Sequence, residues 1–173
     1  MNNPSKDTIL TLEYNYIVDT IRQANEDRIK IFEYFTANII SIIGSFTLFS
    51  SNQQIGVLVI SLLLAFGVTS FLKIIKSRNA WYESVLAMNK IKDFYIKQSP
   101  EIAEAFLWRI NTIPKAGKKF SISFILASFI ALLNTVNVGI ILTLVSAQIG
   151  LVIVLAIVSL AFHYYVWEKS LNR

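Results

Sequence analysis

Residues 55–72, IGVLVISLLLAFGVTSFL, decide the fold class of this chain. The stretch has no Asp, Glu, Lys or Arg, and a bilayer core about 30 Å thick needs roughly 20 mainly apolar residues per helix. Three further uncharged stretches run from about Tyr34 to Ser50, Phe120 to Val145 and Gly150 to Trp167. Four such blocks in 173 residues leave too little polar surface to cover them in water. The sequence therefore predicts an all-α integral membrane protein with four transmembrane helices in two hairpins.

The composition excludes several other classes of protein. Only 16% of the residues are charged and 54% are hydrophobic, whereas soluble domains carry about 25% charged residues. With no Cys, the chain does not fit a soluble enzyme, a disordered chain or a secreted disulfide scaffold. The first 33 residues lack the short apolar core of a cleavable signal peptide, so we expect the first membrane helix to stay in the mature protein.

The last two apolar blocks can be separated in two ways. Either Asn134–Gly139 forms the turn, or Ser146–Gly150 does and the asparagines lie inside the membrane. We favour the second, because Gln148-Ile149-Gly150 repeats the triplet Gln54-Ile55-Gly56 that opens residues 55–72.

Topology follows from the placement of the 16 Lys and Arg residues. Residues 1–34 hold four, residues 73–119 hold ten and the tail after His163 holds two. The two short turns, Ser51–Gln54 and Ser146–Gly150, hold none. Positively charged segments stay in the cytoplasm, which places both termini on the cytoplasmic side of a bacterial inner membrane. The predicted segments are a cytoplasmic amphipathic helix at 1–33, a transmembrane hairpin at 34–72, a cytoplasmic basic helical segment at 73–119, a second transmembrane hairpin at 120–167 and a cytoplasmic tail at 168–173.

The cytoplasmic segments are expected to be helical. Seven residues at alternating steps of four and three form a heptad-like seam, which predicts one helical face. They are Leu10, Tyr14, Ile17, Ile21, Ala24, Arg28 and Ile31. With a start near Pro4 or Ser5 and nothing to break it, a single helix of about 44 residues is predicted, and the part before Tyr34 would reach roughly 40 Å into the cytoplasm.

A matching extension is expected after Leu72, because no Gly or Pro occurs before Pro100. Its apolar stripe comprises Trp81, Val85, Met88, Ile91 and Tyr95. Residues 1–34 carry six acids and four bases, whereas residues 73–98 carry two acids and six bases. We therefore predict an antiparallel pair held by its apolar seams, with the opposite charges setting its register.

Ser99-Pro100-Glu101 has the residues of a helix start, with Ser as cap, Pro in the first turn and an acid near the positive end of the dipole. The sequence predicts a helix of about ten residues through Ala103, Phe106, Leu107 and Ile110. Pro114 and Gly117 should prevent this helix from extending further.

Nothing in the sequence indicates an enzyme. There is one His, no Cys and no glycine-rich phosphate loop, so we expect no catalytic residue, cofactor or metal. His163 lies beside Tyr164, Tyr165 and Trp167, which together predict an aromatic belt at the cytoplasmic interface. It is either a residue at headgroup level with no special role or a pH sensor.

Three asparagines are the deepest polar residues of the predicted membrane segments: Asn38, Asn134 and Asn137. They either hydrogen-bond between helices or line an uncharged pore formed by several copies. Small residues at four-residue steps allow close helix approach, either within one hairpin or between subunits. These are Ala37, Ser41 and Ser45 in the first membrane segment, and Ser61, Ala65 and Thr69 in the second.

The basic composition, with a pI of about 9.5, is explained by the membrane rather than by nucleic acid, which we do not expect as a partner. Lys115, Lys118 and Lys119 lie where lipid headgroups should be. Basic residues near the surface attract anionic lipid, so these three lysines are predicted to contact it.

One helical extension leads into the first hairpin, and a basic helix containing aromatic residues leads out of it. The residues of the second helix are Arg78, Trp81, Tyr82, Lys90, Lys92, Phe94 and Tyr95. Over roughly residues 8–98 this layout resembles the SLATT-like and related four-helix membrane effectors of bacterial antiviral and nucleotide-signalling systems. The resemblance implies a homo-oligomer that perforates the inner membrane when a partner senses infection. Those families often show one hairpin, so the second hairpin is a departure, and no functional residue is transferred.

The sequence therefore favours a non-enzymatic membrane effector or accessory protein, in which copies assemble and the cytoplasmic helices receive a protein or nucleotide signal. The alternatives are a small constitutive channel or solute permease, and a passive membrane scaffold for a partner.

Overall fold

The computed structural model describes residues 6–49, 52–106 and 109–171. The side chains of Lys6, Ile9, Tyr34, Asn38, residues 41–49 and Ala105 lie outside this description. Over the described residues the chain is all-helical and contains no strand. Its elements are α1 (Lys6–Phe49), α2 (Gln53–Gln98), the 3₁₀ helix η1 (Pro100–Ala105), α3 (Ile122–Leu144) and α4 (Ile149–Leu171).

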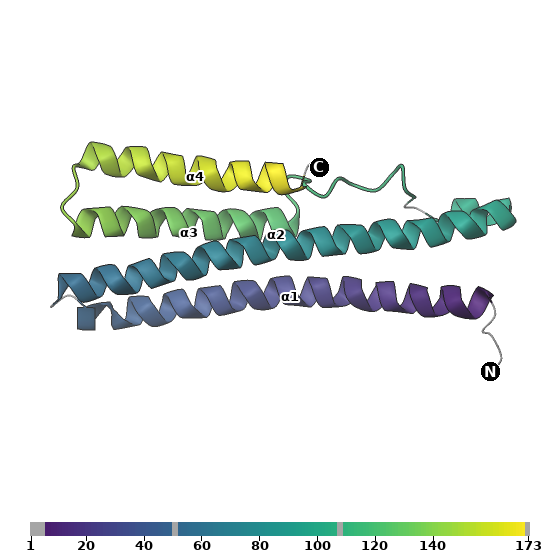
Figure 1. Cartoon of the computed structure of the whole chain (residues 1–173), viewed down its shortest axis with the longest axis horizontal. Helices are drawn as coiled ribbons and strands as arrows, with labels where there is room; N and C mark the ends of the chain where they lie inside the picture. The colour runs from purple at the N-terminus through teal and green to yellow at the C-terminus, as the bar shows by residue number, and fades with distance from the viewer. Residues whose placement is uncertain (1–5, 50–51, 107–108, 172–173) are drawn as a thin grey trace.

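α1 and α2 form a long antiparallel rod (Figure 1). α1 has 44 residues without interruption, which confirms the single helix predicted from the seam. Within that seam Ile17, Ala24 and Arg28 are buried, whereas Tyr14 at its outer end is exposed. The seven-residue spacing thus identified the face of α1 that packs against α2.

α2 has 46 residues and is also continuous. Asn52 caps its start by accepting hydrogen bonds from the backbone N–H groups of Gln54 and Ile55, which satisfies donors that a helix start leaves unpaired. Of the predicted apolar stripe, Val85 is fully buried and the other four residues are half-buried.

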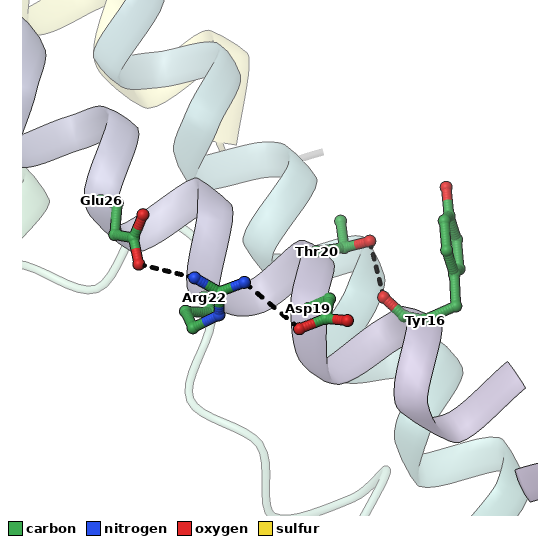
Figure 2. A network of polar contacts seen from close by, with 5 residues as sticks. All are labelled: Tyr16, Asp19, Thr20, Arg22 and Glu26. Atoms are coloured by element: carbon green, nitrogen blue, oxygen red, sulfur yellow. Dashed lines mark hydrogen bonds and ion pairs between the residues drawn. The ribbon is translucent and has the colours of Figure 1, made fainter. Parts of the chain in front are cut away.

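The charges of the rod do not pair between the two helices in the described residues. Figure 2 shows the ion pairs that α1 makes within itself, where Arg22 bonds Glu26 at 3.0 Å and Asp19 at 3.4 Å. These side chains are exposed, and ion pairs in contact with water contribute little to stability. A direct contact between α1 and α2 is instead neutral, because the Ser77 hydroxyl donates to the Ala24 carbonyl at 2.7 Å. The prediction that ion pairs set the register is therefore not supported by the contacts.

The helix predicted after Ser99 is wrong in length and type. Pro100–Ala105 is a 3₁₀ helix of six residues, Ser99 makes no side-chain cap, and Phe106 is extended. Arg109 donates a hydrogen bond to the Ala103 carbonyl, and the Phe106 ring lies 5.4 Å from the Lys92 ammonium. The contact with Lys92 places the extended residue Phe106 against α2, after the helix has ended. Leu107 lies outside the described residues.

α3 and α4 lie beside the first half of α2. α3 packs on α2, and α4 packs on α3 (Figure 1). The connection between them is Val145–Gln148, with Ser146 at a positive φ of 60°. The favoured turn near Ser146–Gly150 is thereby confirmed, and Asn134 and Asn137 lie inside α3.

Three of the described helices are long and apolar enough to cross a membrane: α2, α3 and α4. They expose large apolar side chains, among them Leu62 at 64%, Ile122 at 72% and Ile157 at 62%. Residues 34–49 of the predicted segment 34–50 lie in α1, whereas Ser50 and most of the side chains of the segment fall outside the description. The end of α1 meets the start of α2, so all four predicted segments lie at the same end of the rod (Figure 1).

The main apolar core lies where α1, α2, α3 and the last part of α4 meet. Phe35, Phe71, Ile74, Ile130 and Trp167 are each at most 3% exposed. The core occupies the first part of α3 and the last part of α4, so it holds these two helices to the middle of the rod.

Candidate functional site

A polar core, defined as Asn134, Thr135, Ser159 and His163, lies between α3 and α4. Asn134 is completely buried and its Nδ2 lies 3.2 Å from His163 Nε2. His163 Nδ1 lies 2.8 Å from the Ser159 carbonyl. A carbonyl can only accept, so Nδ1 carries the ring proton and Nε2 accepts from Asn134. Thr135 adds a second link between the helices, 3.2 Å from the Ser159 hydroxyl.

Asn134 also lies against α2. Its Oδ1 has no hydrogen-bond partner among the described residues and occupies the space that a side chain at Gly67 would take. A glycine is therefore needed at position 67 for Asn134 to reach between α2 and α4. The edge of His163 contacts Phe71, with ring centroids 4.8 Å apart.

The three asparagines predicted to be the deepest polar residues lie in different surroundings. Asn134 lies in the polar core, and Asn137 is 7% exposed with its Nδ2 unpartnered within the described part. Asn38 lies in α1, and its side chain is outside the described residues. Within one chain, Asn134 makes an interhelical hydrogen bond; a pore lined by several copies stays a prediction.

His163 and Trp167 are placed differently from the aromatic belt that the sequence predicted. Tyr164 and Tyr165 are exposed, but His163 is 6% and Trp167 is 2% exposed. Trp167 packs edge-on against Phe124 at 5.5 Å. Its spacing from His163 puts both residues on the face of α4 that meets α3, and this face could not be chosen before the partner of α4 was known.

A second cluster, the basic junction, joins the rod to the start of α3. We define it as Arg28, Arg78, Lys115, Lys118 and Lys119. Arg28 donates to the Ser123 hydroxyl in α3, and Arg78 donates from Nε to the Ala116 carbonyl at 2.9 Å. The two arginines therefore fasten the segment that enters α3 to α1 and α2.

Both arginines are more than nine-tenths buried, and none of the described carboxylates is within salt-bridge distance of either. Burial, followed by repulsion from Arg28, lowers the pKa of Arg78 to about 10. Burial lowers the pKa of Arg28 as well. The Arg78 guanidinium lies over the Trp81 ring, 4.1 Å from its centroid, which offsets part of the desolvation.

The three junction lysines are exposed, as the sequence prediction of lipid contact requires. Lys119 lies 3.9 Å from Glu168 and 5.4 Å from the Tyr164 ring centroid. A hydrogen bond with Tyr164, more than the charge of Glu168, raises the pKa of Lys119. The basic junction therefore carries an excess of positive charge.

Only some residues of the polar core and the basic junction could be identified from the sequence. Arg28 stands at an apolar position of the seam, and this position indicated a buried charge. No feature of the sequence indicated that Ser123 and Arg78 would be buried. No group of three or more His, Cys, Asp or Glu side chains that could hold a metal occurs within the described ranges.

No protein-family model matches the chain, and neither a curated protein nor a solved structure is significantly similar to it.

Proposed function

We propose that the protein is a non-enzymatic membrane effector or accessory protein that crosses the bacterial inner membrane four times, with both termini in the cytoplasm. Copies assemble, and a cytoplasmic signal causes them to perturb or permeabilise the membrane, as in antiviral defence systems. The observation that carries this proposal is the continuity of α1 and α2, which run without a break from the charged half of the rod into its apolar half.

Continuity matters because a helix without a kink transmits displacement along its axis. α2 has no Pro and no described break between Gln53 and Gln98. A partner that moves the charged end of the rod would therefore move its apolar end. A protein partner at that end fits the exposed charged faces of α1 and α2.

Assembly is supported by the outer face of α2. Ser61, Ala65 and Thr69 are all exposed, so they do not pack the rod within one chain, which was one of the two interpretations of their spacing. They remain available for close approach of a second copy. Ala37 is exposed too, and Ser41 and Ser45 fall outside the described side chains.

Induced expression in a bacterium tests the proposal with a dye that reports membrane potential. We expect the wild-type chain to depolarise the cells when it accumulates. Ala80→Pro, at an exposed position in α2, should abolish depolarisation because proline kinks a helix interior. Ala80→Ser is the matched control and should behave as wild type.

An unchanged membrane potential, with wild-type protein in the membrane fraction and any candidate partner present, would refute the effector proposal. Depolarisation by Ala80→Pro equal to that of wild type would refute transmission along α2.

A constitutive channel or solute permease is the second candidate, favoured by the polar core and by Asn137, which place five polar side chains along α3 and α4. The purified protein alone would then conduct in liposomes, and replacing Asn134 and Asn137 with Leu would abolish flux while leaving assembly intact. A passive scaffold would show no flux under any condition and a stable partner complex.

A further inference from the structure

A cavity of about 240 Å³ lies between α3 and α4, next to the basic junction. Its floor is formed by Phe71 and Ala131, and its rim by the exposed residues Ser128, Leu160 and Tyr164. The lining is mainly apolar and opens to the side of the molecule that the proposed function places in lipid. A hydrocarbon chain fits these walls.

A polar cleft continues the cavity along α4. Tyr164 lines both, and the cleft adds Lys115, Lys119, Glu168 and Leu171. Because Leu160, Tyr164, Glu168 and Leu171 are three or four residues apart, they lie on one face of α4. The combined groove is thus apolar at one end and charged at the other.

Trp167 supplies the second, independent observation. It lines the cavity, is 2% exposed, and its Nε1 has no acceptor among the described residues. A buried indole N–H normally has a partner. An acceptor that enters with a ligand, such as an ester carbonyl, would complete the site.

Charge selects the kind of ligand. The cleft carries Lys115 and Lys119, with Lys118 beside them, against one acid, Glu168. Arg28 and Arg78, which make hydrogen bonds but no described ion pair, add their charge to the same junction. An anion would therefore be attracted to the charged end of the groove, where it would compete with Glu168 for Lys119.

We infer that this groove binds one anionic phospholipid, with an acyl chain in the α3–α4 cavity, the glycerol ester region at Trp167 Nε1 and the phosphate at Lys115 and Lys119. The inference rests on the membrane placement in the proposed function. It goes beyond general attraction of basic residues to a membrane surface, because it assigns a single lipid to a defined pocket.

The test uses the full chain with Trp81→Phe and Trp108→Phe, so that Trp167 is the remaining tryptophan. The protein is reconstituted in phosphatidylcholine vesicles containing brominated phosphatidylglycerol or, in a parallel sample, brominated phosphatidylcholine at the same mole fraction. We expect stronger quenching of Trp167 by the anionic lipid, and about one retained phosphatidylglycerol per chain after detergent extraction.

Three variants define the site. Lys119→Gln should reduce the preference for the anionic lipid about fivefold, and Glu168→Gln should increase it. Ser128→Phe, which fills the cavity from its exposed rim, should abolish preferential quenching. Lys92→Gln and Thr143→Phe, the latter at an exposed position of α3, are matched controls away from the groove and should leave the preference unchanged.

Equal quenching by both lipids in vesicle-bound protein overturns the lipid site and leaves the proposed function intact. Unchanged preference in Ser128→Phe overturns the acyl pocket and with it the inference. Loss of preference on adding soluble glycerol phosphate assigns the site to a free phosphate and also overturns it. Failure of the protein to float with the vesicles refutes both the lipid site and the proposed function.

Discussion

Gly67 is the residue on which the packing of three helices depends. A Cβ at this position would overlap Asn134 Oδ1, and it would lie 2.8 Å from Asn134 Cγ and 3.1 Å from Phe35 Cε2. Asn134 cannot withdraw freely, because it is buried and bonded to His163.

Gly67→Ala should therefore destabilise the protein by about 1–3 kcal/mol through overpacking, although alanine favours the helix by up to about 1 kcal/mol. Thermal unfolding in detergent measures the effect. Gly56→Ala is the control, since its nearest neighbour would be Leu144 Cδ1 at 3.6 Å. Equal stability of the two variants would contradict the close contact with Asn134, and adding Asn134→Ala should rescue Gly67→Ala.

Arg78 gives a pH-dependent prediction. A base with a lowered pKa binds fewer protons in the folded state, so stability rises with pH between its folded and unfolded pKa values. For Arg78 that window opens at about 10 and extends up to the ordinary pKa of arginine. Arg78→Lys moves it down, because lysine has an ordinary pKa of about 10.4 and would experience the same burial.

The Arg78→Lys variant should therefore gain stability between neutral pH and about pH 10, whereas wild type should begin to gain stability only from about pH 10 upward. Unfolding temperatures over this range provide the measurement, with Arg22→Lys on the exposed face of α1 as the control. A flat profile for Arg78→Lys would show that the site at position 78 is hydrated.

At the scale of elements, the rod was predictable and its attachments were not. The spacing of Ile17, Ala24 and Arg28 predicted the buried face of α1, since helical periodicity is a local property. The contact between Asn134 and His163 joins two helices, and the burial of Trp167 depends on which face of α4 meets α3. Such features arise from tertiary packing and leave no periodic signal in the chain.

η1 shows the same limit for a single element. Ser99, Pro100 and Glu101 favour a helix start, but the helix ends within six residues. Phe106 contacts Lys92 of α2, and local residue preferences do not encode a contact between two elements.

Asn89 in α2 provides a test at this scale. It is 1% exposed, and its Nδ2 donates to the Val85 carbonyl at 2.8 Å. Its Oδ1 accepts no hydrogen bond from the described residues. Asn89→Leu should stabilise the protein by about 1–3 kcal/mol, because it removes an unsatisfied buried group. Chemical denaturation measures the change. For the control Asn15→Leu, on the exposed face of α1, the free energy of unfolding should stay within about 0.5 kcal/mol of the wild-type value. A loss of stability in Asn89→Leu would indicate that Asn89 has a partner.

For the whole molecule, the decisive question is which ends face the cytoplasm. The chain has no Cys, so single cysteines can be labelled without a background. Gln54→Cys and Gln148→Cys, at the uncharged turns, should react in intact cells with a thiol reagent that does not cross the membrane. Gln98→Cys and Lys118→Cys should react only after the cells are opened. Labelling of all four positions in intact cells would contradict the proposed topology.

The attachment of α3 near the middle of the rod has a mechanical consequence. Arg78 lies about 30 Å from Gln98 and about 38 Å from Gln53 along the α2 axis, at 1.5 Å per residue. If the basic junction acts as a fulcrum, α2 is a lever with nearly equal arms. Sideways motion at the charged tip then reappears at the opposite end in the reverse direction and at slightly larger amplitude. A ligand that stiffens the fulcrum would change the pivot without touching either tip.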